Sequence, residues 1–126
     1  MRYDIFLVFL GGGLGAVIRE LLIICTPYES VLSLPIVIAN MTACFFVGIL
    51  AGLISKSKIT SSQSAFLSVG LMGGLSTFST FIYEIVQQIE MIDAVLVAYV
   101  FLSLAIGLAF VVLGLKIGSY RSGSVL

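Results

Sequence analysis

Three stretches of this chain contain no charged residue: 30–55, 59–83 and 94–115. Each is long enough to cross the roughly 30 Å hydrocarbon layer of a bilayer as an α-helix, which takes about 20 apolar residues. A further apolar segment, 5–26, is interrupted only by Arg19 and Glu20. The pattern predicts an all-α integral membrane protein with four transmembrane helices. We expect a single membrane domain, 1–126, with helices at about 4–26, 33–55, 62–88 and 94–118.

The composition supports this class and disfavours several others. Hydrophobic residues make up 60% of the chain and charged residues 10%, against about 25% charged in a typical soluble domain. Six basic and six acidic residues balance, so nothing indicates a nucleic-acid partner. There is no histidine, the side chain that most often acts as a general base, and the two cysteines lack metal-ligand spacing. We therefore expect no enzyme and no organic cofactor.

Basic residues predict the orientation in the membrane. Arg2 precedes an apolar run without a small-residue cleavage site, so we expect no removed signal peptide. With four helices, both chain ends lie on one side, together with the second loop. That side holds five basic residues: Arg2, Lys56, Lys58, Lys116 and Arg121. By the positive-inside rule it is cytoplasmic, and we expect a multi-pass protein of the inner (plasma) membrane.

A polar motif, Gly73 to Phe81 (GGLSTFSTF), lies in the middle of the third apolar segment. Glycine weakens a helix interior by about 1 kcal/mol relative to alanine, so we expect the helix to break near Gly73-Gly74. Such a break frees carbonyls that can coordinate a cation and N–H groups that favour an anion. Ser79 and Thr80 add hydroxyls, and Phe78 and Phe81 can turn positive ring edges toward a small anion. The alternative is a packing notch, with hydroxyls bonded to their own helix.

Polar residues on the other helices could meet this motif. Asn40 must face protein or water, or serve as a hydrogen bond between helices. Arg19 faces a water-filled vestibule or a partner helix, or extends to the nearer membrane surface. Glu84 shares a helical side with Phe81, and on the fourth helix Tyr99 and Ser103, an i, i+4 pair, form a short polar stripe.

These residues together resemble the Fluc/CrcB family of fluoride channels. The family's marks are a glycine-rich first helix ending in arginine, an asparagine in the second helix, and a GGx[ST]TFSTF motif in the third. Here they are matched by Gly11 to Arg19, Asn40, and Gly73 to Phe81. The resemblance covers essentially the whole chain, with its spacing intact.

The resemblance implies an antiparallel, dual-topology homodimer with two pores for passive fluoride efflux. It assigns the fluoride path to seven residues: Asn40, Phe78, Phe81, Ser79, Thr80, Tyr99 and Ser103. It places Arg19 in a vestibule and Glu84 near a pore entrance. It also implies a structural sodium ion at the dimer interface, held by the backbone carbonyls of Gly73 and Ser76.

The chain departs from the family pattern at three positions. Hydroxyl groups that are common in the family are missing at Ile36 and Cys44, and the polar stripe of the fourth helix stops at Gly107. These differences concern the outer parts of the route. The basic residues gathered on one side also oppose dual insertion, which is favoured by a weak charge bias.

Two other functions fit parts of the sequence. A small four-helix proton-coupled multidrug exporter would need a carboxylate within the membrane, for which Glu20 and Glu84 are candidates. It would leave the third-helix motif without a purpose. A non-transporting assembly subunit would explain the glycines, but not the cluster of hydroxyl groups and phenylalanines.

Overall fold

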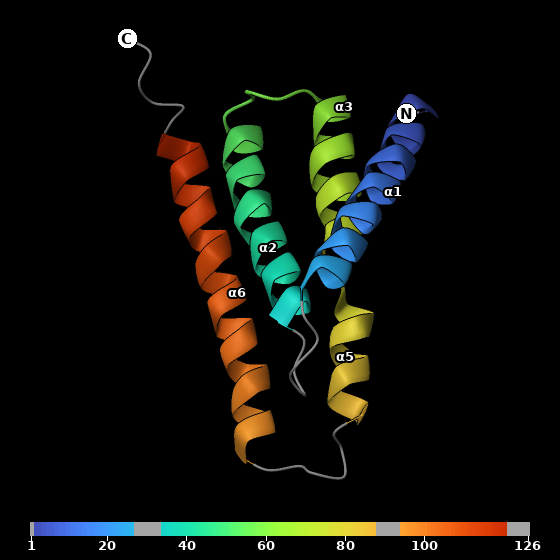
Figure 1. The fold of residues 1–126 in the computed structure, drawn as a ribbon. Helices are drawn as coiled ribbons and strands as arrows, with labels where there is room; N and C mark the ends of the chain where they lie inside the picture. Colours follow the sequence, from blue (N-terminus) through green and yellow to red (C-terminus); the bar gives the residue numbers. More distant parts are fainter. Residues whose placement is uncertain (1, 27–33, 88–93, 121–126) are drawn as a thin grey trace.

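The structure is a computed structural model that describes residues 2–26, 34–87 and 94–120 (Figure 1). Every regular element in these ranges is helical. The elements are α1 (Arg2–Cys25), α2 (Leu34–Ser55), α3 (Ser61–Ser64), the π-helical η1 (Ala65–Met72), α4 (Gly73–Leu75), α5 (Phe78–Gln87) and α6 (Ala94–Tyr120).

Among the described residues, four helical spans are long and apolar enough to cross a membrane, as the sequence predicts. They are Tyr3–Cys25, Leu34–Ser55, Ser61–Gln87 and Ala94–Tyr120. The third span combines α3, η1, α4 and α5. The helix limits expected at 33 and 88, the loops beginning at 27 and 89, and the tail from 121 lie outside the described residues.

Local sequence accounts for where two of the spans begin. In α2, Pro35 occupies the first turn, where its missing N–H group would have no helical partner. The third span begins with a capping box: the Gln63 N–H donates to Thr60 Oγ1 at 3.2 Å, and the Thr60 N–H donates to Gln63 Oε1 at 2.9 Å. Both arrangements satisfy backbone groups that a helix start leaves free.

The spans pack as two helix pairs. α2 lies alongside α6, and α1 crosses η1 and α4 (Figure 1). Glycines make both contacts close: a Cβ added at Gly114 would overlap the Phe45 carbonyl oxygen, and one at Gly74 would overlap the carbonyl oxygen of Gly12. Small residues allow such backbone approach in membrane helices, where packing takes the place of the hydrophobic effect.

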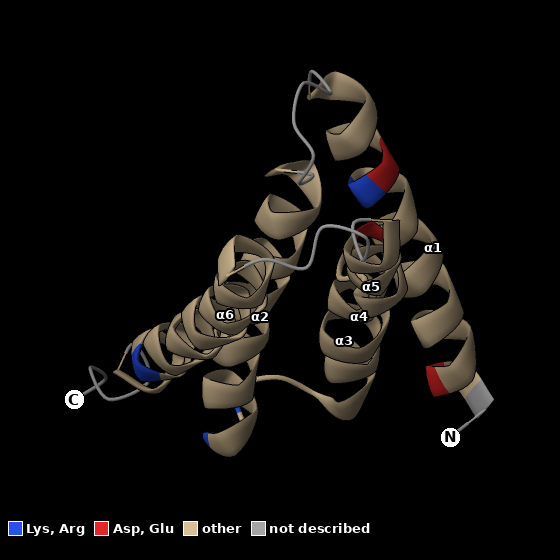
Figure 2. Ribbon diagram, turned by 90° about the horizontal axis from the view of Figure 1, so that it is seen from below, with Lys and Arg blue, Asp and Glu red and all other residues tan. Residues whose placement is uncertain are grey.

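Outward-facing side chains are large and apolar, as lipid contact requires. Phe9, Phe101 and Leu108 are among many such exposed residues. Figure 2 shows how few charged residues the helices carry. Within the four spans they are Asp4, Arg19 and Glu20 of α1, Glu84 of α5 and Lys116 of α6. The buried core is small and lies where the two pairs meet, around Ala39, Ala43 and Leu75.

The break in the third span does not occur where the sequence predicts it. Gly73 and Gly74 are helical and belong to α4. The chain leaves the helix at Ser76, whose backbone is extended (φ −73°, ψ 151°), and α5 begins at Phe78. Gly74 serves instead in the close contact with α1. The helix breaks two residues later because the groups able to bond its freed backbone lie there.

Candidate functional site

The interrupted backbone at Ser76 and Thr77 is the centre of the candidate site. The Ser76 N–H still donates to the Met72 carbonyl at 3.0 Å, so the first half of the span stays helical up to the break. The second half starts with a side-chain cap: the Thr80 N–H donates to Thr77 Oγ1 at 3.2 Å. Thr77 thus caps α5 in the manner typical of threonine at a helix start.

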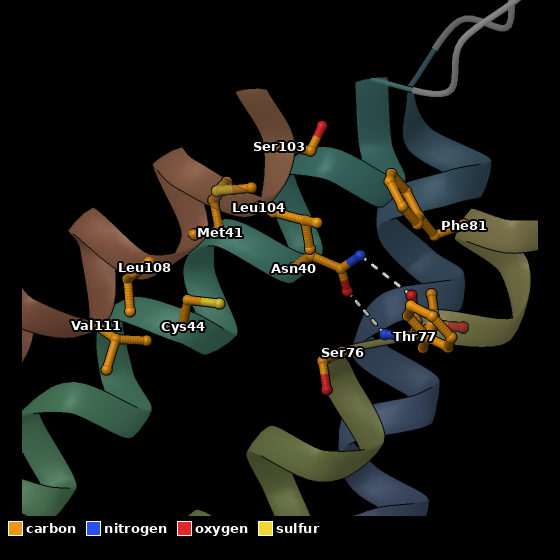
Figure 3. Close-up of a pocket in the computed structure, with 12 residues that line it drawn as sticks. Asn40, Met41, Cys44, Ser76, Thr77, Phe81, Ser103, Leu104, Leu108 and Val111 are labelled. Atoms are coloured by element: carbon orange, nitrogen blue, oxygen red, sulfur yellow. Dashed lines mark hydrogen bonds between the residues drawn. The ribbon is translucent and has the colours of Figure 1, made fainter. Parts of the chain in front are cut away.

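Asn40 of α2 bonds both backbone groups of Thr77 (Figure 3). The Thr77 N–H donates to Asn40 Oδ1 at 2.7 Å, and Asn40 Nδ2 donates to the Thr77 carbonyl oxygen at 3.1 Å. Thr77 is buried, so without this amide its backbone groups would be left unbonded in a low-dielectric interior. Asn40 therefore stabilises the break itself.

Arg19 of α1 bonds the other side of the break. Its Nη1 donates to the carbonyl oxygen of Gly74 at 3.1 Å. This carbonyl belongs to the last turn of the first half-helix, where orphan carbonyls carry partial negative charge and a cation is favourable. The half-buried Arg19 thus faces a neighbouring helix, one of the two alternatives that the sequence left open. Glu20, beside it, is exposed.

The hydroxyl groups of Thr77, Ser79 and Thr80 cluster at the start of α5. Thr77 Oγ1 donates to Thr80 Oγ1 at 2.9 Å and lies 3.4 Å from Ser79 Oγ. The predicted hydroxyls of Ser79 and Thr80 are therefore held at the start of α5 by Thr77. Thr77 is not among the seven residues that the family resemblance assigns to the fluoride path, although its hydroxyl is one of those in the motif that can cap a second half-helix. The signal was present, since a threonine directly before a helical run is a frequent N-cap.

The aromatic side chains form a row. The Phe81 ring lies between Phe78, with centroids 6.5 Å apart, and Tyr99 of α6, with centroids 5.6 Å apart. Phe81 is buried, at 6% exposure, whereas Phe78 is 71% exposed. The ring planes are tilted by 35° and 34°. The row lies at the start of α5, next to the break, but only one of the two predicted phenylalanines is enclosed by this chain.

A cavity of about 390 Å³ opens beside Asn40 and the break, between α2, α5 and α6 (Figure 3). It brings together four of the seven residues predicted for the fluoride path, Asn40, Phe78, Phe81 and Ser103, with the break residues Ser76 and Thr77. Its remaining wall is apolar or sulfur-bearing: Met41, Cys44, Leu104, Gly107, Leu108 and Val111. Most of this wall could not be predicted from the sequence, because one apolar residue on a membrane helix cannot be told from another by its sequence position.

Two of the three departures from the family pattern lie on this cavity. Cys44 and Gly107 both line it. Ile36, the third, is fully buried at 1% exposure in the α2 core and does not line it.

Glu84 and Tyr99 each carry a buried oxygen atom without a hydrogen-bond partner among the described residues: Glu84 Oε2 and Tyr99 Oη. Glu84 is only 7% exposed. Within this chain Glu84 is therefore a buried residue of α5, and its place near a pore entrance stays a prediction. Neither oxygen lines the cavity described above.

The fold and site define a four-helix membrane protein with a polar break in its third span. The chain matches the family described as CrcB-like protein, camphor resistance (CrcB), over residues 6–115. It belongs to that family, as its motifs indicate.

Curated relatives agree with this assignment. The chain is 38% identical to fluoride-specific ion channel FluC 3 of Yersinia pseudotuberculosis over 117 residues, which cover 90% of this chain and 87% of the relative. It is 35% identical to fluoride-specific ion channel FluC of Gloeothece citriformis, over 89% of this chain and 94% of the relative. Fluoride-specific ion channel FluC 2 of Brucella melitensis is 34% identical, and there the match covers 97% of this chain but 46% of the relative.

Proposed function

We propose that the protein is a fluoride-selective ion channel that allows passive fluoride efflux and so confers fluoride resistance. The observation that carries the proposal is the broken third span, whose freed backbone groups are bonded by Asn40 and Arg19 beside a cavity at Phe78 and Phe81. The relatives named as fluoride-specific ion channels support the choice of ion. The protein is then a channel and not an enzyme.

The groups at the cavity suit a small, strongly hydrated anion. An amide nitrogen carries two hydrogens, and Asn40 Nδ2 uses one of them for the Thr77 carbonyl, so the second remains for an anion. Ring edges of Phe78 and Phe81 carry partial positive charge, and the Ser103 hydroxyl can donate. These donors replace part of the hydration shell without a full cation that would hold the anion too tightly to leave.

We propose Ser79, Thr80 and Tyr99 as further members of the path. Tyr99 packs on Phe81 and offers a buried hydroxyl, which can pass an anion along α6 toward Ser103. Ser79 and Thr80 place hydroxyls at the start of α5. For Arg19 we propose an electrostatic role, since its charge next to the break raises the local anion concentration. Glu84 would act near the end of the path.

The proposed working unit is an antiparallel, dual-topology homodimer with two pores. One chain leaves Phe78 largely exposed and its cavity incompletely enclosed, so a second copy would complete the walls. The exposed face at Gly73, where an added Cβ would meet nothing within 4 Å, is available for that contact. The proposed location is the inner (plasma) membrane.

The proposed structural sodium ion fits the backbone at the break. The Gly73 and Ser76 carbonyls are hard oxygen ligands at the end of a half-helix, the arrangement that binds sodium in other membrane proteins. Arg19 bonds the carbonyl of Gly74, on the side that packs against α1, which leaves the exposed Gly73 side for a cation. Bound there, the ion would neutralise the partial charge of the helix end and link two chains.

Fluoride efflux from liposomes tests the function, with chloride efflux as the control. We expect wild-type protein to release fluoride rapidly and chloride slowly, and Phe78→Ile, Phe81→Ile and Asn40→Asp to reduce fluoride release. Undiminished flux in both phenylalanine variants would exclude the ring-edge mechanism. Proton-driven uptake of a quaternary ammonium dye, without fluoride efflux, would replace the channel by a multidrug exporter that uses Glu84.

A further inference from the structure

Two sulfur-bearing side chains of α2 face the cavity beside Asn40. Met41 and Cys44 are three residues apart, so they lie on the same side of the helix, and both line the cavity (Figure 3). Both are half-buried. The function proposed above uses neither of them, since a thioether and a thiol are weak partners for a hard anion.

Both side chains converge on one residue of α6. The Cβ position of a side chain at Gly107 would lie 3.5 Å from Cys44 Sγ and 3.8 Å from Met41 Cε. Gly107 has no side chain, so the position at which a Cβ would contact both groups is left unfilled. The three flexible bonds of methionine allow its sulfur to move toward the thiol within that space.

We propose that Met41 and Cys44 form a binding site for a soft monovalent metal ion, of the Cu⁺ or Ag⁺ class, and that its occupancy blocks the anion path. Thiolate and thioether sulfur are the ligands that select soft metals. On binding, the Cys44 thiol releases its proton to water and its sulfur forms a bond to the metal, while Met41 donates a lone pair. No electron is transferred. The blocking effect rests on the proposed channel function, but the metal site does not.

The charge and position of the complex favour binding and block. A monovalent cation bound to one thiolate forms a neutral complex, which can occupy a cavity with apolar walls without leaving an unpaired charge. The site shares its cavity with Asn40 and Phe81, the residues proposed to hold fluoride. Fluoride is a hard ligand and competes poorly for a soft metal, so the fluoride that passes through the channel would not displace the bound metal.

Silver ion is the probe, and the experiment uses the full-length protein with Cys25→Ser as background. Cys25 is exposed at the end of α1, away from the cavity, and its removal leaves one thiol. Fluoride efflux is measured from liposomes in nitrate buffer, because chloride precipitates silver. Each variant is compared with itself, with and without micromolar silver nitrate. Native mass spectrometry of the detergent-solubilised protein measures silver binding separately.

We expect silver to reduce efflux of the Cys25→Ser protein at least tenfold and thiosulfate to restore it. Cys44→Ser and Cys44→Ala in this background should be insensitive, and Met41→Leu should raise the half-blocking concentration at least about tenfold, as loss of a supporting ligand group does. Equal block of both Cys44 variants would overturn the proposed block, and equal silver binding with and without Cys44 would overturn the site. Absence of fluoride efflux before silver is added would instead refute the channel function, while the binding measurement would still decide the metal site.

Discussion

Asn40 and Thr77 are joined by two hydrogen bonds, of 2.7 and 3.1 Å, through which a side chain of α2 bonds the interrupted backbone of the third span. In a membrane, backbone groups freed by a break must be bonded within the protein. Asn40 supplies one acceptor and one donor at the same residue. The asparagine is thus a structural part of the break as well as a candidate fluoride ligand.

The first prediction concerns replacement of Asn40 by aspartate. The carboxylate can still accept from the Thr77 N–H, but it cannot donate to the Thr77 carbonyl and adds a negative charge beside it. Each unbonded buried group costs about 1–3 kcal/mol. We expect a lower melting temperature in detergent and at least about a tenfold loss of fluoride efflux, the effect of 1.4 kcal/mol. Thr42→Ala, on the same helix and away from the cavity lining, is the matched control.

The second prediction separates charge from geometry at Arg19. Arg19→Gln removes the cation at the end of the first half-helix, and we expect it to destabilise the protein by about 1–2 kcal/mol in denaturant unfolding. Arg19→Lys keeps the charge and should recover part of the loss. Glu20→Gln changes the adjacent exposed residue and should leave stability within about 0.5 kcal/mol of wild type. Equal stability of all three variants would contradict the role of the Gly74 contact.

The third prediction distinguishes the two phenylalanines. Phe81 is buried between Phe78 and Tyr99, whereas Phe78 is 71% exposed in the single chain. We therefore expect Phe81→Ile to reduce both thermal stability and fluoride efflux. Phe78→Ile should reduce efflux with a smaller effect on the stability of the monomer. A larger loss of monomer stability in the Phe78 variant would show that the aromatic row is not packed as described.

The fourth prediction tests the helix contact between α2 and α6. A Cβ at Gly114 would overlap the Phe45 carbonyl oxygen, whereas a Cβ at Gly13 of α1 would meet nothing within 4 Å. We expect Gly114→Ala to lower the melting temperature clearly. Gly13→Ala should be neutral or stabilising, since alanine is favoured over glycine in a helix by about 1 kcal/mol. The same loss in both variants would mean that the contact is not specific.

The sequence was sufficient to predict the four spans and the polar character of the third. The thickness of the hydrocarbon layer and the free-energy cost of burying a charge apply to each segment separately. The length and composition of a segment were therefore enough to predict whether it spans the membrane. The motif from Gly73 to Phe81 marked the region of the break for the same local reason. The exact position of the break was predicted wrongly, because the prediction used only the low intrinsic helix propensity of the glycine pair.

Tertiary structure decided where the third span breaks and which residues stabilise the break. The contacts that do so join Asn40 to Thr77, 37 positions apart, and Arg19 to Gly74, 55 positions apart. Gly74 packs closely against Gly12 of α1, and this contact offsets the low helix propensity of glycine, so Gly74 and the preceding Gly73 are helical. A break forms in a membrane only where other helices can bond the freed backbone. That condition depends on which helices are neighbours, and no single segment contains this information.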